Sequence, residues 1–277
     1  MGFRVSTNIA AINAQRNLLS SQMQINDSMS KLASGSRINK AADDAAGLAI
    51  SESIKAQVRS ARQANRNAND GISMVQTAEG GLNEIGNIIV RLRELGIQAA
   101  SDTVGDTERS FIDKEVQQLK NEVQRIASVT TWGTTKLLDG STPVFDFQVG
   151  LFNDDFEDRI SFDSAENVAT LDALALEGLD YASKEGAQEA LGLLDDAQTN
   201  VNGMRANLGA LQNRLTSTVQ NLLVAEENLS AANSRIRDTD VAEASAEMTR
   251  NNILLQAATS TLAQANQVNA TALKLIG

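Results

Sequence analysis

Residues 208–236, LGALQNRLTSTVQNLLVAEENLSAANSRI, carry a large aliphatic side chain at every seventh position. The repeat runs through Leu208, Leu215, Leu222, Leu229 and Ile236, with Leu211, Ala225 and Ala232 in a companion row. A seven-residue repeat places these side chains on one stripe of an α-helix, as in a coiled coil. The segment therefore predicts a long helix over residues 185–236 that packs against other helices.

Both ends of the chain predict further helices of the same kind. After the polar joint at residues 237–240, a C-terminal seam combines large side chains with a row of small ones: Val241, Met248, Leu255, Leu262 and Ile276 alternate with Ala244, Ala258, Ala265 and Ala272. Residues 4–33 form an N-terminal seam that contains Val5, Ile9, Ile12, Leu18, Leu19, Ile25, Met29 and Leu32. Because isolated helices are marginal in water, we expect both arms to be mobile in the free monomer and ordered by neighbours.

Between these ends the pattern predicts two more helices. One covers residues 41–99, capped by Asn39, with a possible break near residues 69–71 or 80–81 where glycine occurs. After a polar stretch, the next has a narrow apolar face: Ile112, Val116, Leu119, Val123 and Ile126. The period then shortens, and residues 144–162 predict a short β-hairpin. Residues 164–184 are compatible with more than one structure. The predicted fold is mainly α: long antiparallel helices in a coiled-coil-like bundle, with a small β-hairpin region in the middle.

Composition excludes several functional classes. The formal net charge is −11 and only 3% of residues are aromatic, which argues against nucleic acid as a partner. Acidic residues concentrate in residues 139–196, where Arg159 and Lys184 are the only basic side chains, so this region is expected to face water. No apolar run is long enough to cross a membrane, so no membrane insertion is expected. The start of the chain lacks a cleavable signal pattern, which predicts export without a cleaved signal peptide.

Catalytic and metal chemistry also lack the residues that they need. The sequence contains no cysteine and no histidine, and it has no phosphate-binding glycine loop and no nucleophile elbow. Asp154, Asp155, Glu157 and Asp158 gather in a few residues, but they lack the spacing of a calcium loop. No catalytic residue, cofactor site or metal site is predicted, and the chain is not expected to be an enzyme.

Two motifs, in order along the chain, resemble the conserved ends of bacterial flagellin. The first is Leu32-Ala-Ser-Gly-Ser-Arg-Ile-Asn39, followed by Ala42-Asp-Asp-Ala-Ala-Gly-Leu-Ala-Ile-Ser51. The second is Ser234-Arg-Ile-Arg-Asp-Thr-Asp240, followed by Ile253-Leu-Leu-Gln-Ala257 and Leu262-Ala-Gln-Ala-Asn266. Phe147-Gln-Val-Gly150 also resembles the hairpin entry of that family's core domain. Trp132-Gly133-Thr134 departs from the aromatic-Asn-Gly turn that is usual there, although Gly133 still allows a turn.

The resemblance implies a short flagellin, secreted to the bacterial flagellum, that polymerises with copies of itself into a helical filament used as a passive propeller. Residues 1–40 and 237–277 would form the paired inner filament domain, and residues 41–140 and 185–236 the helical core domain. Residues 141–184 would form a short acidic outer region in place of a large outer domain. Inner-tube packing is expected at Val5, Ile9, Ile12, Leu19, Met248, Leu255, Ala258, Leu262, Ala265 and Ala272.

The resemblance also implies partners other than the chain itself. Flagellar cap, junction and export chaperone proteins would bind a chain of this family. Arg91, Leu95 and Glu115 match residues through which flagellins contact a host Toll-like receptor and pack between protofilaments, while Gly96 stands where alanine is usual. Three alternatives remain open from sequence. They are a hook-filament junction protein, a secreted helical ligand or adhesin that host innate immune receptors recognise, and a secreted helical translocator that binds membranes.

Overall fold

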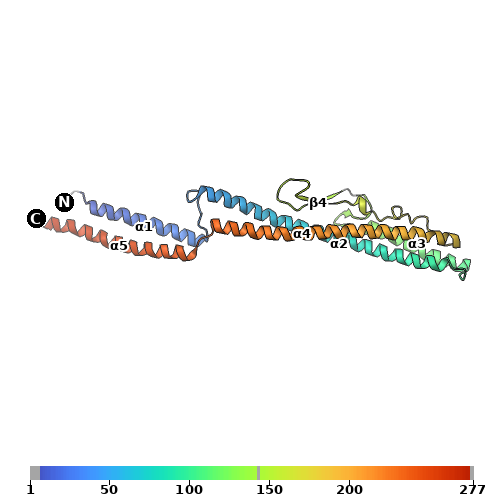
Figure 1. The fold of residues 1–277 in the computed structure, drawn as a ribbon. Helices are drawn as coiled ribbons and strands as arrows, with labels where there is room; N and C mark the ends of the chain where they lie inside the picture. Colours follow the sequence, from blue (N-terminus) through green and yellow to red (C-terminus); the bar gives the residue numbers. More distant parts are fainter. Residues whose placement is uncertain (1–6, 142–143, 275–277) are drawn as a thin grey trace. The chain divides into compact units, whose positions relative to one another are not determined.

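The computed structural model describes residues 7–141 and 144–274, with side chains described as far as residue 267. Its helices are α1 (Ile9–Ser34), α2 (Ala45–Ala99), α3 (Asp106–Val129), the short 3-10 helix η1 (Ala165–Asn167), α4 (Lys184–Arg237) and α5 (Val241–Lys274). Its strands are β1 (Thr131–Trp132), β2 (Thr135–Lys136), β3 (Phe145–Gln148) and β4 (Arg159–Phe162). The predicted fold class, mainly α with small hairpins in the middle of the chain, is confirmed (Figure 1). Val5 and the side chain of Ala272 lie outside the described residues.

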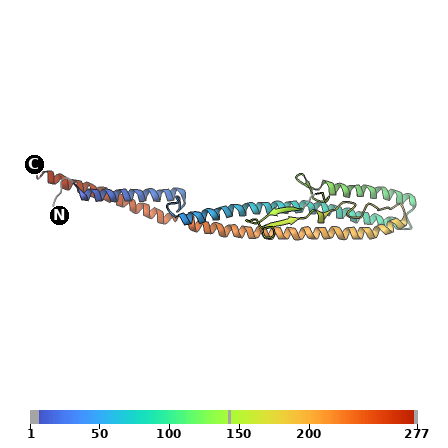
Figure 2. The same ribbon diagram turned by 90° about the horizontal axis from the view of Figure 1, so that it is seen from above.

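The chain divides into two compact units. The terminal unit contains Met1–Val58 and Asn228–Gly277, and the central unit contains Arg59–Glu227. In the terminal unit α1 and α5 lie side by side and antiparallel, so the start of α1 lies beside the later part of α5 (Figure 1). In the central unit α2, α3 and α4 pack together, and the β3–β4 hairpin lies along α2 and α4 (Figure 2).

The core of the central unit is formed by α2, α3, α4 and the chain that connects α3 to α4. The heptad leucines of α4 are fully buried at Leu208 and Leu215, as their spacing predicts. They share one cluster with large aliphatic side chains of α2 and α3: Leu82, Ile85, Ile89 and Leu92 from α2, and Ile112, Val116 and Val123 from α3. Because these stripes are narrow, each helix keeps a polar face outside the bundle.

Helix α2 is continuous, so the break considered near residues 69–71 or 80–81 does not occur. Two of the three glycines there, Gly71 and Gly81, allow close packing, whereas Gly80 has no neighbour within 4 Å. A β-carbon on Gly71 would lie 3.2 Å from the ring of Phe147, and one on Gly81 would lie 2.7 Å from Oγ1 of Thr130. Sequence alone shows a weak helix former at these positions, whereas the structure shows a neighbour that needs the space.

The sequence predicts the C-terminal cap of α1 correctly but not the N-terminal cap of α2. Gly35 ends α1 in the left-handed conformation at φ 68°, as its place after Ser34 predicts. The prediction that Asn39 caps the second helix is wrong, because α2 begins at Ala45 and Oδ1 of Asp44 accepts the backbone N–H of Gly47. Asn39 instead donates from its side-chain amide to the carbonyl of Ser36, inside the preceding loop.

The hairpin of β3 and β4 lies within residues 144–162, where strands are predicted, whereas only a turn is predicted at the hairpin of β1 and β2. Gly133 adopts φ 62° in the two-residue turn between β1 and β2, which confirms the turn expected there. In the second hairpin Phe145 pairs with Phe162 and Phe147 with Ile160. The segment from Asp163 to Ser183, whose structure the sequence left open, contains η1 and otherwise irregular chain. Its apolar side chains are buried in the central core: Leu174, Leu176, Leu179 and Tyr181.

Candidate assembly surfaces

The first candidate surface is the seam between α1 and α5. Its buried or half-buried positions follow a 3-4 rhythm on both helices: Ala11, Ala14, Leu18, Ser21, Ile25, Ser28 and Leu32 on α1, and Ala244, Met248, Asn251, Leu255, Ala258, Leu262 and Ala265 on α5. The side-chain amide of Asn8 donates to the carbonyl of Ala265 at 3.0 Å, while its oxygen caps the N–H of Ala11. The two helices of one chain therefore bury this seam against each other.

The predicted packing residues divide between this seam and a second face. Met248, Leu255, Ala258, Leu262 and Ala265 lie in the seam and face α1 of the same chain. Ile9, Ile12 and Leu19 do not, because they lie on the opposite side of α1. The sequence pattern did not distinguish two apolar stripes of α1, which the structure places on opposite sides of the helix.

The second candidate surface is this outward side of the terminal helices. Ile9, Ile12, Leu19 and Met23 recur at helical spacing on α1, and between 51% and 65% of each residue is exposed. On α5, Ile253 and Leu254 are also exposed, at 62% and 48%. One chain alone thus leaves large aliphatic side chains in water on both helices, and such patches commonly mark contact surfaces.

The loop after α1 and the junction between α4 and α5 are connected by backbone hydrogen bonds. The N–H of Arg37 donates to the carbonyl of Arg237 at 2.6 Å, and the N–H of Thr239 donates to the carbonyl of Gly35 at 3.0 Å. The guanidinium of Arg37 donates to the carbonyl of Ile236 at 2.8 Å. In the same loop Asp43 accepts the N–H groups of Lys40 and Asn39, and these bonds lower its pKa.

Of the three predicted receptor-contact residues, Arg91 and Glu115 lie together at the surface, whereas Leu95 is buried. The guanidinium of Arg91 donates to the carboxylate of Glu115 at 2.9 Å and to that of Glu94 at 2.9 Å, and these contacts raise the pKa of Arg91. The side chains of Arg91 and Glu115 are about half exposed, at 50% and 46%. Leu95, in contrast, is 3% exposed and belongs to the core. Arg91 and Glu115 form a polar surface between α2 and α3 that does not include Leu95.

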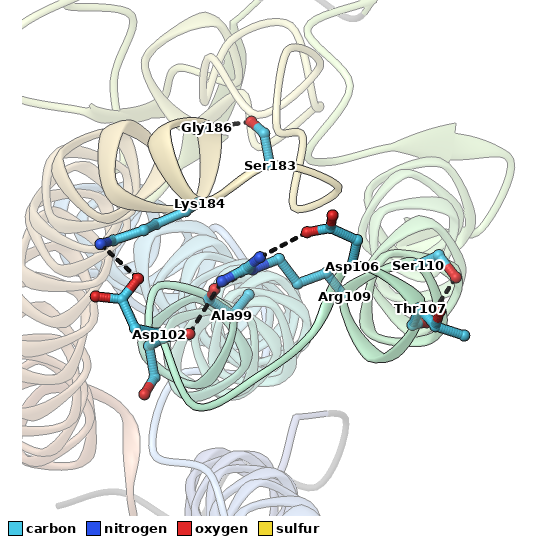
Figure 3. Close-up of polar contacts among 10 residues, drawn as sticks. Ala99, Asp102, Asp106, Thr107, Arg109, Ser110, Ser183, Lys184 and Gly186 are labelled. Atoms are coloured by element: carbon cyan, nitrogen blue, oxygen red, sulfur yellow. Dashed lines mark hydrogen bonds and ion pairs between the residues drawn. The ribbon is translucent and has the colours of Figure 1, made fainter.

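The turn between α2 and α3 depends on residues that sequence reasoning missed (Figure 3). Arg109 is 8% exposed, and its guanidinium donates to the carbonyls of Ala99 and Ser101 at 2.9 and 3.0 Å. Lys184, at the start of α4, pairs with Asp102 at 2.7 Å and lowers the pKa of that carboxyl group. A signal for Arg109 existed, because it lies one helical turn before Ile112 on the buried stripe of α3.

Tyr181 explains why glycine stands at position 96. The tyrosine is fully buried, its hydroxyl donates to the carbonyl of Leu92 at 3.0 Å, and burial raises its pKa to about 12. A β-carbon on Gly96 would lie 3.3 Å from that hydroxyl and 3.1 Å from Cδ2 of Leu191. The missing side chain therefore makes room for a tyrosine from a segment that the sequence left unassigned.

Among the described residues the structure shows neither a metal-binding cluster nor a membrane-spanning helix. Over residues 7–141 and 144–274, no three carboxylates gather in a way that could hold a metal ion. In the same part of the chain, no helix has the length and apolarity that crossing a membrane requires. A terminal unit of paired helices with exposed aliphatic side chains, and a central unit of long helices with short hairpins, are typical of structural proteins that assemble through helical surfaces.

Comparison with known proteins identifies the family within that class. Family models for the bacterial flagellin N-terminal and C-terminal helical regions match residues 5–142 and 191–276. The chain is 43% identical over 272 residues to a flagellin of Halalkalibacterium halodurans, covering 98% of this chain and 99% of that protein. It is also 43% identical over 284 residues to the flagellar filament core protein flaB2 of Brachyspira hyodysenteriae, with the same coverage. The crystal structure of Bacillus cereus flagellin aligns with a TM-score of 0.51 at 28% identity, covering 57% of this chain and 88% of that one.

The chain belongs to the bacterial flagellin family. It is a structural subunit of the bacterial flagellar filament and not an enzyme. Self-polymerisation and an extracellular place in the flagellum follow from this membership.

Proposed function

We propose that the outward faces of α1 and α5 drive polymerisation by packing against the terminal helices of other copies. The observation that carries this proposal is the exposed stripe of Ile9, Ile12, Leu19 and Met23, which lies opposite the seam that α1 shares with α5. Burying a large aliphatic side chain contributes about 1.5–3 kcal/mol, so a repeated stripe supplies a strong drive for association. A chain that presents different surfaces to successive neighbours grows an open helical fibre.

The proposal assigns roles to the regions outlined by sequence. Residues 1–40 and 237–277 would form the inner domain of the filament, with Val5 and Ala272 among its packing residues. Residues 41–140 and 185–236 would surround it, and residues 141–184 would lie outermost. The exposed carboxylates of that last region support its contact with water, although its leucines and Tyr181 belong to the core.

Partners other than the chain itself are also proposed. Cap and junction proteins would meet the same terminal faces at the ends of the polymer, and an export chaperone would cover them before assembly. Arg91 and Glu115 would contact a host Toll-like receptor, with Leu95 only positioning the helix from the core. Arg91→Ala should then reduce activation of a receptor reporter cell line by soluble monomer, whereas an unchanged response would remove this contact.

Polar substitutions on α1 test the assembly proposal directly. Ile12→Asn with Leu19→Asn should prevent salt-induced filament formation, seen by electron microscopy, while the monomer keeps its helical circular dichroism. The matched control is Gln15→Asn with Gln22→Asn, two exposed polar positions of the same helix. Normal filaments from the Ile12 and Leu19 variant would refute the role of this face, and loss of filaments in both variants would show that α1 tolerates no change.

A further inference from the structure

The loop between β3 and β4 presents two large aromatic side chains to water. Phe152 and Phe156 are 73% and 85% exposed, although the chain has only seven phenylalanines. Every residue from Phe152 to Glu157 is exposed, and we call these six residues the aromatic tip. Exposing two rings in one short loop costs solvation free energy, which a binding partner would recover.

The aromatic tip is held in shape by its own hydrogen bonds. Oδ1 of Asp154 accepts the backbone N–H groups of Phe156 and Glu157, both at 2.9 Å, and these bonds lower the pKa of Asp154. The side chain of Gln148 donates to the carbonyl of Phe152 at 2.8 Å. At the base of the loop a β-carbon on Gly150 would lie 1.7 Å from Oδ1 of the buried Asp158. Since the loop is already ordered, binding through it would cost little conformational entropy.

The tip also carries negative charge without full local compensation. Asp155 forms an ion pair with Arg159, and Asp154 is engaged by backbone N–H groups. Within the part of the chain that the structure describes, the carboxylate of Glu157 has no hydrogen-bond or ion-pair partner. The tip therefore combines two exposed rings with uncompensated carboxylate charge, and arginine is the side chain that suits both groups.

A complementary surface lies on α2 of the same central unit. Arg59, Arg62 and Arg66 recur at spacings of three and four, so they share one exposed face, which we call the arginine stripe. Arg62 pairs with Glu226 at 2.6 Å and Arg66 bonds the neutral amide of Gln63. Over the described residues, Arg59 has no carboxylate partner. The stripe thus offers guanidinium groups that the chain itself does not neutralise.

The tip lies against the face of α2 that is next to the stripe. The loop leaves a groove of about 310 Å³ against Ser60, Gln63 and Asn67, and the side chain of Asn67 donates to the carbonyl of Gln148 at 3.0 Å. Each of these positions follows a stripe residue by one, which places the two rows about 100° apart around the helix axis. Among the described residues no hydrogen bond or ion pair joins the tip to the stripe, so the match is available to another copy.

We propose that the aromatic tip of one copy docks on the arginine stripe of a second copy, with Phe152 and Phe156 over guanidinium groups and Glu157 paired with Arg59. The proposal rests on the polymerisation proposed above and names a lateral contact within it. Two copies of a chain with net charge −11 repel each other, and a local match of opposite charge offsets that repulsion where they meet. Because the two surfaces differ, the contact leaves a free tip and a free stripe and can continue along a fibre.

Cysteine crosslinking tests this contact, because the natural chain contains no cysteine. Phe156→Cys and Arg59→Cys are combined in one chain, which is polymerised, treated with a short bismaleimide and separated on a denaturing gel. We expect a ladder of multimers from filaments and none from dilute monomer. The matched control pairs Arg59→Cys with Phe111→Cys, another exposed phenylalanine of the central unit, and should give no ladder.

A charge exchange provides an independent measurement. Glu157→Lys should raise the critical concentration for assembly about five-fold at low salt, and Arg59→Glu in the same chain should restore it. Filaments that form normally without a crosslinked ladder, or with an unchanged critical concentration for Glu157→Lys, would overturn the contact and leave polymerisation intact. Failure of the unsubstituted chain to polymerise would instead refute the proposed function itself.

Discussion

Replacing Arg109 with alanine should destabilise the central unit more than any exposed substitution. The guanidinium of Arg109 satisfies the carbonyls of Ala99 and Ser101 at the end of α2, where no further helical turn can do so. Ala99 is fully buried, so its carbonyl cannot simply exchange Arg109 for water. The third contact, with Asp106 at 2.9 Å, is different because that carboxylate is 94% exposed.

The expected loss follows from these three contacts. A hydrogen bond that involves a charged group contributes about 1.5–3 kcal/mol net, and leaving a buried carbonyl unpaired is costly. Two such bonds, one of them at the partly exposed Ser101, give a loss of about 3–4 kcal/mol in the free energy of unfolding. The ion pair with Asp106 adds less than about 1 kcal/mol, since it is screened by solvent.

Urea unfolding followed by the fluorescence of Trp132 measures this loss within the central unit, because the chain has one tryptophan. With a slope of about 2–3 kcal/mol per molar urea, the midpoint of Arg109→Ala should fall by roughly 1–2 M. The urea midpoint of Arg109→Lys should lie between those of the unsubstituted chain and Arg109→Ala, because an ammonium group lacks the planar fork of a guanidinium group. If Asp106→Asn lowers the midpoint as much as Arg109→Ala does, the exposed ion pair is the main contribution and the reasoning is wrong.

Three further outcomes are expected. Among glycine-to-alanine changes, Gly203→Ala should stabilise by up to about 1 kcal/mol in thermal unfolding, because nothing lies within 4 Å of the added carbon. Gly96→Ala should be nearly neutral, because the helix propensity that alanine gains is offset by its close approach to Tyr181 and Leu191. Gly150→Ala should destabilise strongly, because the added carbon would overlap Asp158. A strongly stabilising Gly150→Ala would contradict this order. Asp102, Asp139 and Asp195 have pKa values below 3.8, so the stability that they contribute is present above that value and is lost as the pH falls through their folded pKa values. Urea midpoints that stay constant from pH 5 to pH 2.5 would exclude this linkage. Backbone amides of residues 9–30 and 245–267 should exchange quickly in the monomer and slowly in the polymer. Strong protection in the monomer would show that the α1–α5 seam alone is enough to order both helices.

The helices could be predicted from sequence because their repeats are long and uninterrupted. Leu208 and Leu215 are buried as their spacing requires, and Gly35 ends α1 as its position requires. Spacing alone could not tell which of two apolar stripes on α1 faces its partner. Ile25 and Leu19 are equally apolar, and only the position of α5 makes one buried and the other exposed.

Contacts between distant segments explain what sequence reasoning missed. Gly71 and Gly81 are weak helix formers, and only the positions of Phe147 and Thr130 show why α2 continues through them. Tyr181 follows an irregular stretch without periodicity, so nothing local indicates that it reaches Gly96 and the carbonyl of Leu92. Long-range packing overrides local propensity at these positions.

The composition of the α1–α5 seam links the fold of the ends to assembly. Ser21, Ser28 and Asn251 lie buried in it beside alanines, so the seam contains few large apolar contacts for its length. The large side chains Ile9, Ile12 and Leu19 lie outside it and gain burial only from another copy. Ordering two long helices costs backbone entropy at every residue, whereas burial in the seam offsets this cost only at the positions that face the partner helix. We therefore expect the terminal unit to be most stable in the polymer, with folding of the ends and filament growth coupled in one equilibrium that shifts with chain concentration.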